Sequence, residues 1–193
     1  MNIIALTGPK GSGKDTVADL LVAHYQARWK TVHRLAFADP IKKMVQHIFN
    51  LDNRTNDEYD RMKRASIDIF DGDRIMKTVQ GRHVVREIGM LMREYNDKQF
   101  NNYIEEQFKS VHFTNNNVFV ITDLRFDNEY TMLRHWGANI VKVDRPGYAY
   151  DGHITERGFD EHLVDFTIDN SGSLADLTLT IQGLTSTIDK ENR

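Results

Sequence analysis

Lys14 stands at the end of a glycine-rich stretch, and this combination of residue types suits the binding of phosphate. Residues 8–14 read GPKGSGK, so four residues separate two glycines and the lysine follows the second. Glycines let successive backbone N–H groups point into one concavity, and a lysine ammonium can reach the outer phosphates of a nucleotide. The stretch therefore predicts a phosphate-binding loop that contains Gly11, Ser12, Gly13, Lys14, Asp15 and Thr16.

The residue after the lysine departs from the usual form of this loop. The common form has Ser or Thr there, with a hydroxyl that binds Mg²⁺, whereas this chain has Asp15 followed by Thr16. A carboxylate at this position could hold the metal through water or lie beside the transferred phosphoryl group, and the residues alone leave both roles open. A glycine-rich turn without a ligand is the alternative, and the apolar run before it and the helical pattern after it argue against that.

A second pair of candidate residues follows a later apolar run. Asp123 comes directly after the run VFVIT at 118–122, and Arg125 lies two residues further on. Ligands of parallel α/β sheets bind at the carboxyl ends of the strands, so Asp123 is a candidate for the metal and Arg125 for a bidentate phosphate contact. A helix-capping aspartate and a solvated arginine are the alternatives.

Basic residues in three other segments could bind further phosphate groups. A mobile loop that carries arginines can cover a phosphate site and exclude water from it, and the long polar loop after residue 143 is such a segment. For every one of these side chains, an ordinary solvated surface residue is the alternative. The candidates are Arg61, Lys63 and Arg64 in a polar segment, Arg82, Arg86 and Arg93 on one predicted helix, and Arg145 and Arg157 in the long loop.

The elements that must position these residues alternate between apolar runs and helical patterns, which predicts βαβ units and a parallel sheet. We expect an α/β fold of three layers, with helices on both faces of the sheet. Residues 1–193 would form one phosphate-loop domain, with a helical substrate-binding insert near 50–100 and a lid near 144–162. The expected strands are 2–7, 31–37, 118–122, 139–143 and 164–168, and the expected helices are 14–29, one from Asp39, 82–95, 97–109, 127–136 and a last one after residue 173.

Composition narrows the class of protein. The chain has 193 residues, a formal net charge of −3 and no cysteine. This charge argues against a general nucleic-acid binder, and the lack of cysteine excludes disulfides and thiolate metal sites. We expect a cytoplasmic protein without a signal peptide or membrane span. The last helix carries enough apolar residues to serve both a core and a partner, so a homodimer is left open.

The motifs together resemble those of bacteriophage-type deoxynucleoside monophosphate kinases, which have the phosphate-loop nucleotide-kinase fold. The ending Lys14-Asp15-Thr16 resembles the family's loop, in which an aspartate replaces the usual Ser or Thr. The other matching segments are Leu35-Ala36 with Asp39 to Lys42, Tyr59-Asp60-Arg61, Thr122 to Arg125 with Glu129, Arg145-Pro146-Gly147, His153 to Glu156, and Asp169 to Leu174.

This resemblance implies ATP- and Mg²⁺-dependent phosphorylation of a deoxynucleoside 5′-monophosphate to the diphosphate. The loop and Lys14 would bind the ATP phosphates, and Arg145 or Arg157 would stabilise the transferred group. The expected catalytic residues are Lys14, Asp15, Asp123, Arg125 and Arg145, the expected metal-binding residues are Asp15, Thr16 and Asp123, and the residues expected to bind the acceptor phosphate are Lys10, Arg61, Arg86 and Arg125. Another small-metabolite kinase, of the dephospho-coenzyme A or phosphomevalonate type, and a nucleotide-gated binding module are the alternatives.

Overall fold

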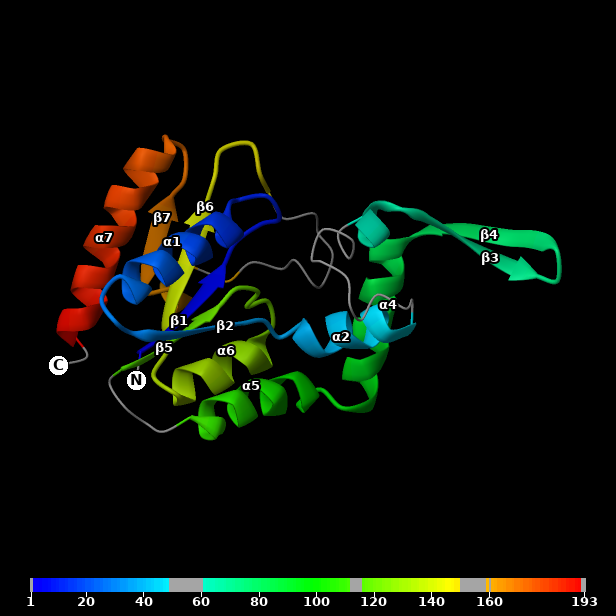
Figure 1. The fold of residues 1–193 in the computed structure, drawn as a ribbon, viewed down its shortest axis with the longest axis horizontal. Helices are drawn as coiled ribbons and strands as arrows, with labels where there is room; N and C mark the ends of the chain where they lie inside the picture. Colours follow the sequence, from blue (N-terminus) through cyan, green and yellow to red (C-terminus); the bar gives the residue numbers. More distant parts are fainter. Residues whose placement is uncertain (1, 49–60, 112–115, 150–158, 160, 192–193) are drawn as a thin grey trace. The chain divides into compact units, whose positions relative to one another are not determined.

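The computed structural model describes residues 2–48, 61–111, 116–149, 159 and 161–191, and the chain forms two compact units (Figure 1). The first unit comprises Met1–Phe37 and Ile104–Arg193, and the second comprises Ala38–Tyr103. The expected insert at 50–100 lies within the second unit. Most of the expected lid, at 150–158 and 160, lies outside the described residues, and so do Arg157 and the motif at 153–156.

A five-stranded sheet forms the centre of the first unit, in the order β2-β5-β1-β6-β7. Every pair of neighbouring strands is parallel. The middle strands are nearly continuous apolar runs because helices cover both faces of a parallel sheet. The strands are β1 (Asn2–Thr7), β2 (Thr31–Leu35), β5 (Asn117–Ile121), β6 (Asn139–Asp144) and β7 (Phe166–Asp169).

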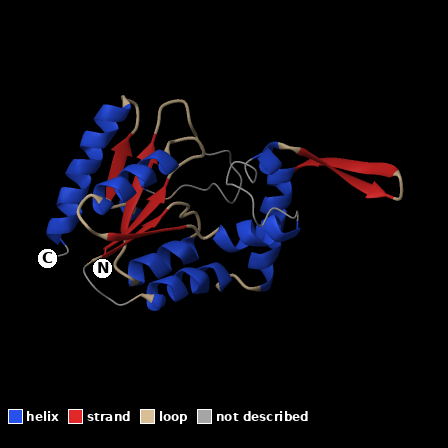
Figure 2. Cartoon of the chain, viewed as in Figure 1, coloured by secondary structure: helices blue, strands red, loops and turns tan. Residues whose placement is uncertain are grey.

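Helices cover both faces of this sheet, as Figures 1 and 2 show. On one face, α1 (Lys14–Gln26) and α7 (Leu174–Glu191) bury their apolar side chains against alternate residues of the strands. On the other face lies α5 (Gln99–Ser110), whose Phe108 ring meets the ring of Phe119 at 4.8 Å between centroids. Helix α6 (Asp127–His135) lies beside α5, and a short 3₁₀ turn, η2 (Glu161–Leu163), precedes β7. The predicted three-layer α/β fold is therefore confirmed.

Among its described residues, the second unit contains two long helices, a hairpin, a short helical stretch at 61–64 and the start of α5. Helices α2 (Asp39–Ile48) and α4 (Gly81–Tyr95) pack closely at Gly89, where an added Cβ would lie 2.9 Å from Ile41 Cδ1. Strands β3 (Ser66–Asp71) and β4 (Arg74–Gln80) form an antiparallel pair, which Figure 2 shows in red. The expectation of a helical insert did not include this hairpin.

Strand β4 has almost no buried face, because six of its seven side chains are exposed and only Val79 is buried. The segment was predicted as part of a helical insert, although its residues 66–69 (SIDI) alternate between polar and apolar types. The turn is formed by Gly72, whose φ of 59° is in the left-handed region that favours glycine. An Asp-Gly pair between two short runs that contain Ile and Val was the available signal.

The other predicted elements agree with the structure to within a few residues. Helix α1 ends at Gln26 rather than at 29, and β2 ends at Leu35 rather than at 37. Among the described residues, no helix combines the length and the apolar character needed to cross a membrane.

Candidate phosphate-binding and catalytic site

The loop between β1 and α1 has a backbone that only glycine accommodates. Gly11 and Gly13 have φ values of 83° and 99°, in the left-handed region. Neighbouring groups also occupy the space that a side chain would need. An added Cβ would lie 2.4 Å from Cε1 of Tyr148 at Gly11, and 2.3 Å from Nδ2 of Asn170 at Gly13. The backbone conformation thus requires glycine at both positions, and a Cβ would in addition displace the Tyr148 ring or the Asn170 carboxamide.

Lys14 is the first residue of α1, and its side chain turns back over the loop. Its Nζ donates hydrogen bonds to the carbonyl oxygens of Gly8 at 2.7 Å and Pro9 at 2.8 Å. The N-cap residue of α1 is Gly13, which makes no side-chain cap hydrogen bond to the first turn. The first-turn N–H groups and the ammonium therefore present positive charge on the loop, an arrangement that binds anions.

Asp15 lies in an ion pair with a residue that sequence analysis did not select. Its Oδ1 is 2.7 Å from Nη2 of Arg34, and its side chain is 87% exposed. Arg34 also pairs with Asp19 through its other terminal nitrogen. Arg34 lies on β2 and has no sequence neighbour that would mark it, so only the fold reveals this contact. The expected metal-binding role of Asp15 stays a prediction, and the neighbouring Thr16 is also exposed.

Asp123 and Arg125 follow β5 directly, beside the end of β1. The N–H of Leu124 donates to the carbonyl oxygen of Leu6 at 3.2 Å, which fixes this segment next to the central strand. Oδ1 of Asp123 accepts a hydrogen bond of 2.8 Å from the backbone N–H of Phe37, at the end of the segment after β2. The carboxylate is therefore held at the carboxyl edge of the sheet, as the sequence predicted.

Glu129 in the first turn of α6 holds the backbone of this same segment. Its side chain is fully buried, and Oε2 accepts hydrogen bonds from the backbone N–H groups of Arg125 at 2.9 Å and Phe126 at 3.2 Å. In the sequence, Glu129 stands in a segment that resembles a family motif, and that resemblance gives it no role. An acidic residue three positions after the helix start is the signal that could have found it.

Arg145 follows β6, on the other side of β1. Its guanidinium Cζ lies 5.3 Å from the centroid of the Tyr148 ring, and that ring contacts Gly11. Arg145 is thus linked to the phosphate-binding loop through an aromatic side chain. Both side chains are exposed.

The strand order explains how these residues come together. Strand β1 is central, so its loop lies between the segments that follow β5 and β6. The loop from Lys10 to Thr16, Asp123 with Arg125, and Arg145 consequently share one sheet edge. Arg61 and Arg86 belong to the second unit, where Arg61 is exposed in a helical stretch and Arg86 is half-buried on α4. Their contact with the acceptor stays a prediction.

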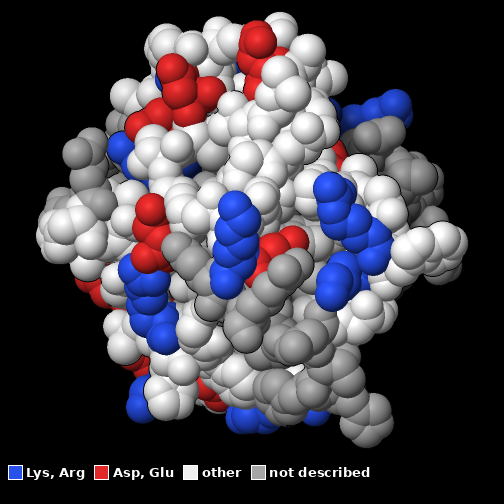
Figure 3. Space-filling view, turned by 90° about the vertical axis from the view of Figure 1, so that its left-hand side faces the viewer, with Lys and Arg blue, Asp and Glu red and all other residues white. Residues whose placement is uncertain are grey.

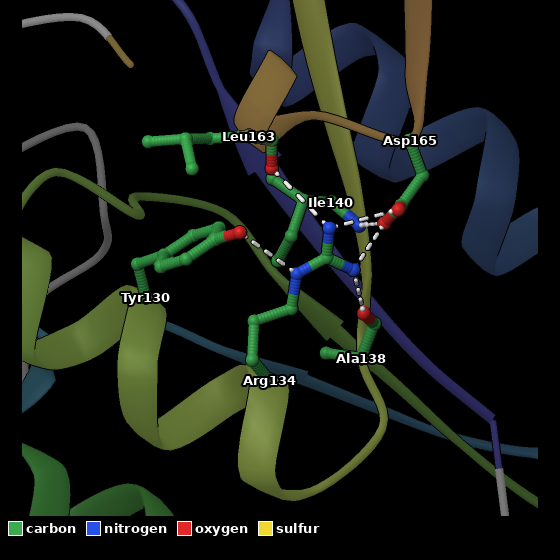
Figure 4. A network of polar contacts seen from close by, with 6 residues as sticks. All are labelled: Tyr130, Arg134, Ala138, Ile140, Leu163 and Asp165. Carbon is green, nitrogen blue, oxygen red and sulfur yellow. Dashed lines mark hydrogen bonds and ion pairs between the residues drawn. The ribbon is translucent and has the colours of Figure 1, made fainter. Parts of the chain in front are cut away.

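A polar network anchors the chain just before β7 (Figure 4). Arg134 of α6 forms a bidentate ion pair with Asp165, with distances of 2.7 and 2.9 Å, and Asp165 also accepts the N–H of Ile140 at 2.7 Å. Arg134 Nε donates to the Tyr130 hydroxyl at 3.0 Å, and Arg134 reaches the carbonyl oxygens of Ala138 and Leu163. The hydrogen bond with Asp165 raises the pKa of Arg134 above its usual value. The network ties α6, the start of β6 and the segment after η2 together.

Charged side chains of both signs mix on the molecular surface. On the face drawn in Figure 3, lysine and arginine are interspersed with aspartate and glutamate among uncharged residues. A mixed surface of this kind matches the small net charge of −3.

The fold and the loop together define a phosphate-loop protein of the kinase type. A model of the family described as Deoxynucleotide monophosphate kinase matches residues 2–94 and 74–181. The chain therefore belongs to the deoxynucleotide monophosphate kinase family, as the sequence motifs predicted.

Individual relatives agree with this assignment. A putative deoxynucleotide monophosphate kinase of Acanthamoeba polyphaga mimivirus is 30% identical over 155 residues, which cover 78% of this chain and 78% of that protein. The deoxynucleotide monophosphate kinase of Enterobacteria phage T4 is 26% identical, with 92% of this chain and 95% of that protein covered.

A solved structure shares the fold. Dephospho-CoA kinase from Campylobacter jejuni superposes with a TM-score of 0.54 at 13% identity, and the match covers 100% of this chain and 99% of that one. At this identity the likeness concerns the fold alone.

Proposed function

We propose that this chain transfers the γ-phosphoryl group of ATP to a deoxynucleoside 5′-monophosphate, with the diphosphate and ADP as products. The observation that carries the proposal is the glycine loop with Lys14 at the carboxyl end of β1, between Asp123 and Arg145, in a chain of the deoxynucleotide monophosphate kinase family. Phosphoryl transfer asks the protein mainly for positioning and charge neutralisation, which this edge of the sheet can supply.

The loop fits the triphosphate of a donor nucleotide. Its left-handed glycines and the N-terminus of α1 offer backbone N–H groups, and Lys14 offers a mobile cation. When bound, ATP supplies the phosphoryl group and Mg²⁺ neutralises the charge that develops on its β- and γ-oxygens. The side chains that would hold the metal are Asp123 and Thr16, with Asp15 as a further candidate through water.

The carboxylates present suit Mg²⁺ because this ion takes one or two carboxylates together with substrate phosphates and water. Among the residues that the structure describes, no group of three or more histidine, aspartate and glutamate side chains could hold a metal alone. The ion pair with Arg34 places a positive charge beside Asp15, which offsets part of the repulsion between this carboxylate and the donor phosphates.

The positive charge of the remaining basic residues suits them to bind phosphate groups. Arg125 and Lys10 in the first unit would bind the phosphate of the acceptor, and so would Arg61 and Arg86 in the second. Arg145 would stabilise the group in transfer, because a guanidinium binds phosphate oxygens in a bidentate way. The attacking phosphate oxygen is already ionised at neutral pH, so the reaction needs no strong general base.

Two further expectations belong to this proposal. The kinase would work in the cytoplasm, that of the host cell if a phage encodes it. A homodimer through α7 would use the exposed Leu174 and Leu179, whereas Leu177, Ile181 and Ile188 lie in the core. Light scattering at several protein concentrations tests this assembly.

A coupled assay of ADP release from Mg-ATP tests the proposed reaction directly. A panel of deoxy- and ribonucleoside monophosphates, with dephospho-coenzyme A and phosphomevalonate as further acceptors, identifies the substrate. We expect turnover with one or more deoxynucleotides and none in the Lys14→Ala variant. Turnover with a non-nucleotide acceptor alone, or unchanged activity in the lysine variant, would refute the proposal.

A further inference from the structure

Asn170 reaches the phosphate-binding loop from the far end of the chain. It lies in the turn between β7 and α7, and its Nδ2 donates a hydrogen bond of 2.8 Å to the carbonyl oxygen of Ser12. Its own backbone N–H donates to the carbonyl oxygen of Asp144, the last residue of β6, at 2.7 Å. The carboxamide is thus supported by the sheet and points into the backbone of the loop.

Because the peptide bond is planar, this contact with the Ser12 carbonyl also determines where the N–H of Gly13 points. The structure contains no cis peptide among its described residues, so the carbonyl of Ser12 and the N–H of Gly13 point in opposite directions across one plane. Because Asn170 holds the carbonyl on its own side, the N–H of Gly13 is directed to the other side of the loop. That N–H belongs to the set that a phosphate-binding loop offers to its anion.

The Ser12 side chain offers the peptide no alternative support. Its hydroxyl oxygen is buried and has no hydrogen-bond partner within the part of the chain that the structure describes. The backbone N–H of Ser12 bonds within the loop, to the carbonyl oxygen of Pro9 at 3.2 Å. Asn170 is therefore the group that fixes the orientation of the Ser12–Gly13 peptide from outside the loop.

Gly13 is matched to this contact. A Cβ at residue 13 would lie 2.3 Å from Nδ2 of Asn170, and the φ of 99° is in the region that L side chains rarely adopt. The glycine thus leaves the space into which the carboxamide enters. Any other residue at position 13 would either strain the backbone of the loop or displace the Asn170 carboxamide.

We propose that Asn170 is a positioning residue for the donor phosphates: it acts through the Ser12–Gly13 peptide and not by contact with the base or sugar. This inference rests on the proposed function, because it assigns the loop to a triphosphate. Loss of one neutral hydrogen bond of about 1 kcal/mol corresponds to about a fivefold change in affinity. Asn170→Asp should lose more affinity than Asn170→Ala, since a carboxylate oxygen would face the Ser12 carbonyl oxygen.

Calorimetric titration with Mg-ATP and with inorganic tripolyphosphate separates a contact with the loop from a contact with the base. The proteins are the wild type, Asn170→Ala, Asn170→Asp and Ser171→Ala as a matched control from the same turn. Ser171 has an exposed side chain and contributes its backbone N–H to Asp169, which the alanine variant retains. Thermal unfolding and the KM of the monophosphate acceptor are measured on the same proteins.

We expect both Asn170 variants to lose affinity for ATP and for tripolyphosphate equally, by about fivefold or more. Ser171→Ala should keep the affinity of the wild type for both ligands. The acceptor KM stays within about twofold of the wild type, because a general defect of folding would raise it too. A loss for ATP alone would show a contact with the base or sugar and overturn the inference, as would unchanged affinity. A wild type that binds neither ligand would refute the proposed function itself.

Discussion

Replacement of Glu129 tests whether a buried carboxylate holds the segment after β5 that carries Asp123 and Arg125. One oxygen of this side chain accepts two backbone N–H groups, those of Arg125 and Phe126, at 2.9 and 3.2 Å. Each bond contributes about 1–1.5 kcal/mol net, so Glu129→Ala should lower the free energy of unfolding by about 3 kcal/mol. Glu129→Gln keeps an oxygen that can accept both bonds and should cost about 1 kcal/mol.

The effect on activity follows from the position of Arg125. When the two backbone bonds are lost, this segment can shift, and a displacement of about 1 Å at an active site can cost about a hundredfold in rate. We expect kcat of Glu129→Ala to fall by about tenfold or more, whereas Glu129→Gln should stay within about threefold. Urea unfolding and the coupled kinase assay measure the two effects on the same proteins.

A matched control removes the same charge from the same helical turn. Asp127 is exposed in the first turn of α6, so Asp127→Asn should cost less than about 1 kcal/mol, through the helix dipole alone. If the free energy of unfolding of Glu129→Ala lies within about 0.5 kcal/mol of that of the wild type and its kcat is unchanged, Glu129 does not hold this segment.

Three other perturbations have defined outcomes. Gly11→Ala should abolish ATP binding in calorimetry, because the φ of 83° and the ring 2.4 Å from the new Cβ both oppose it; wild-type affinity would contradict this. Arg134→Met should lower the free energy of unfolding by about 2 kcal/mol in urea, because it removes the bidentate pair with Asp165. Burial, and then the nearby Arg28, lower the pKa of His24 below its ordinary 6.5. The unfolded chain therefore takes up this proton first, so stability is complete above pH 6.5 and falls as the pH drops below it. Between pH 7.5 and 5.5, the urea midpoint of His24→Gln should change less with pH than that of the wild type. An equal change in both proteins would show that His24 is not the group responsible.

The centre of the parallel sheet was predictable because β1, β5 and β6 are largely buried on both faces. Such strands appear in the sequence as short apolar runs, and the intervening helices show their own spacing, as for α1 and α6. The glycine loop was predictable because all its residues are adjacent in the chain. The β3–β4 hairpin was not predicted, although the alternation at 66–69 and the Asp71-Gly72 pair were available as signals.

The supporting contacts of the site could not be found from spacing. Asn170 and Ser12 are separated by 158 residues, and Arg34 and Asp15 by 19, so no local pattern joins them. Their side chains are common surface types whose partners are determined by the order of the strands. Sequence patterns indicate which residues can do chemistry, and the fold determines which residues hold them in place.

The central place of β1 has a consequence for how the protein is made. Of the five strands of the sheet, this one is synthesised before the others, but its two neighbours, β5 and β6, begin only at residues 117 and 139, and Asn170, which contacts the loop, comes later still. At a translation rate of about 5–20 residues per second, about 8–30 seconds pass between the synthesis of the glycine loop and that of Asn170. The loop thus gains the last of these structural supports only after residue 170 has been synthesised. A chain that ends before β5 would carry the whole glycine motif without either of the strands that pair with β1.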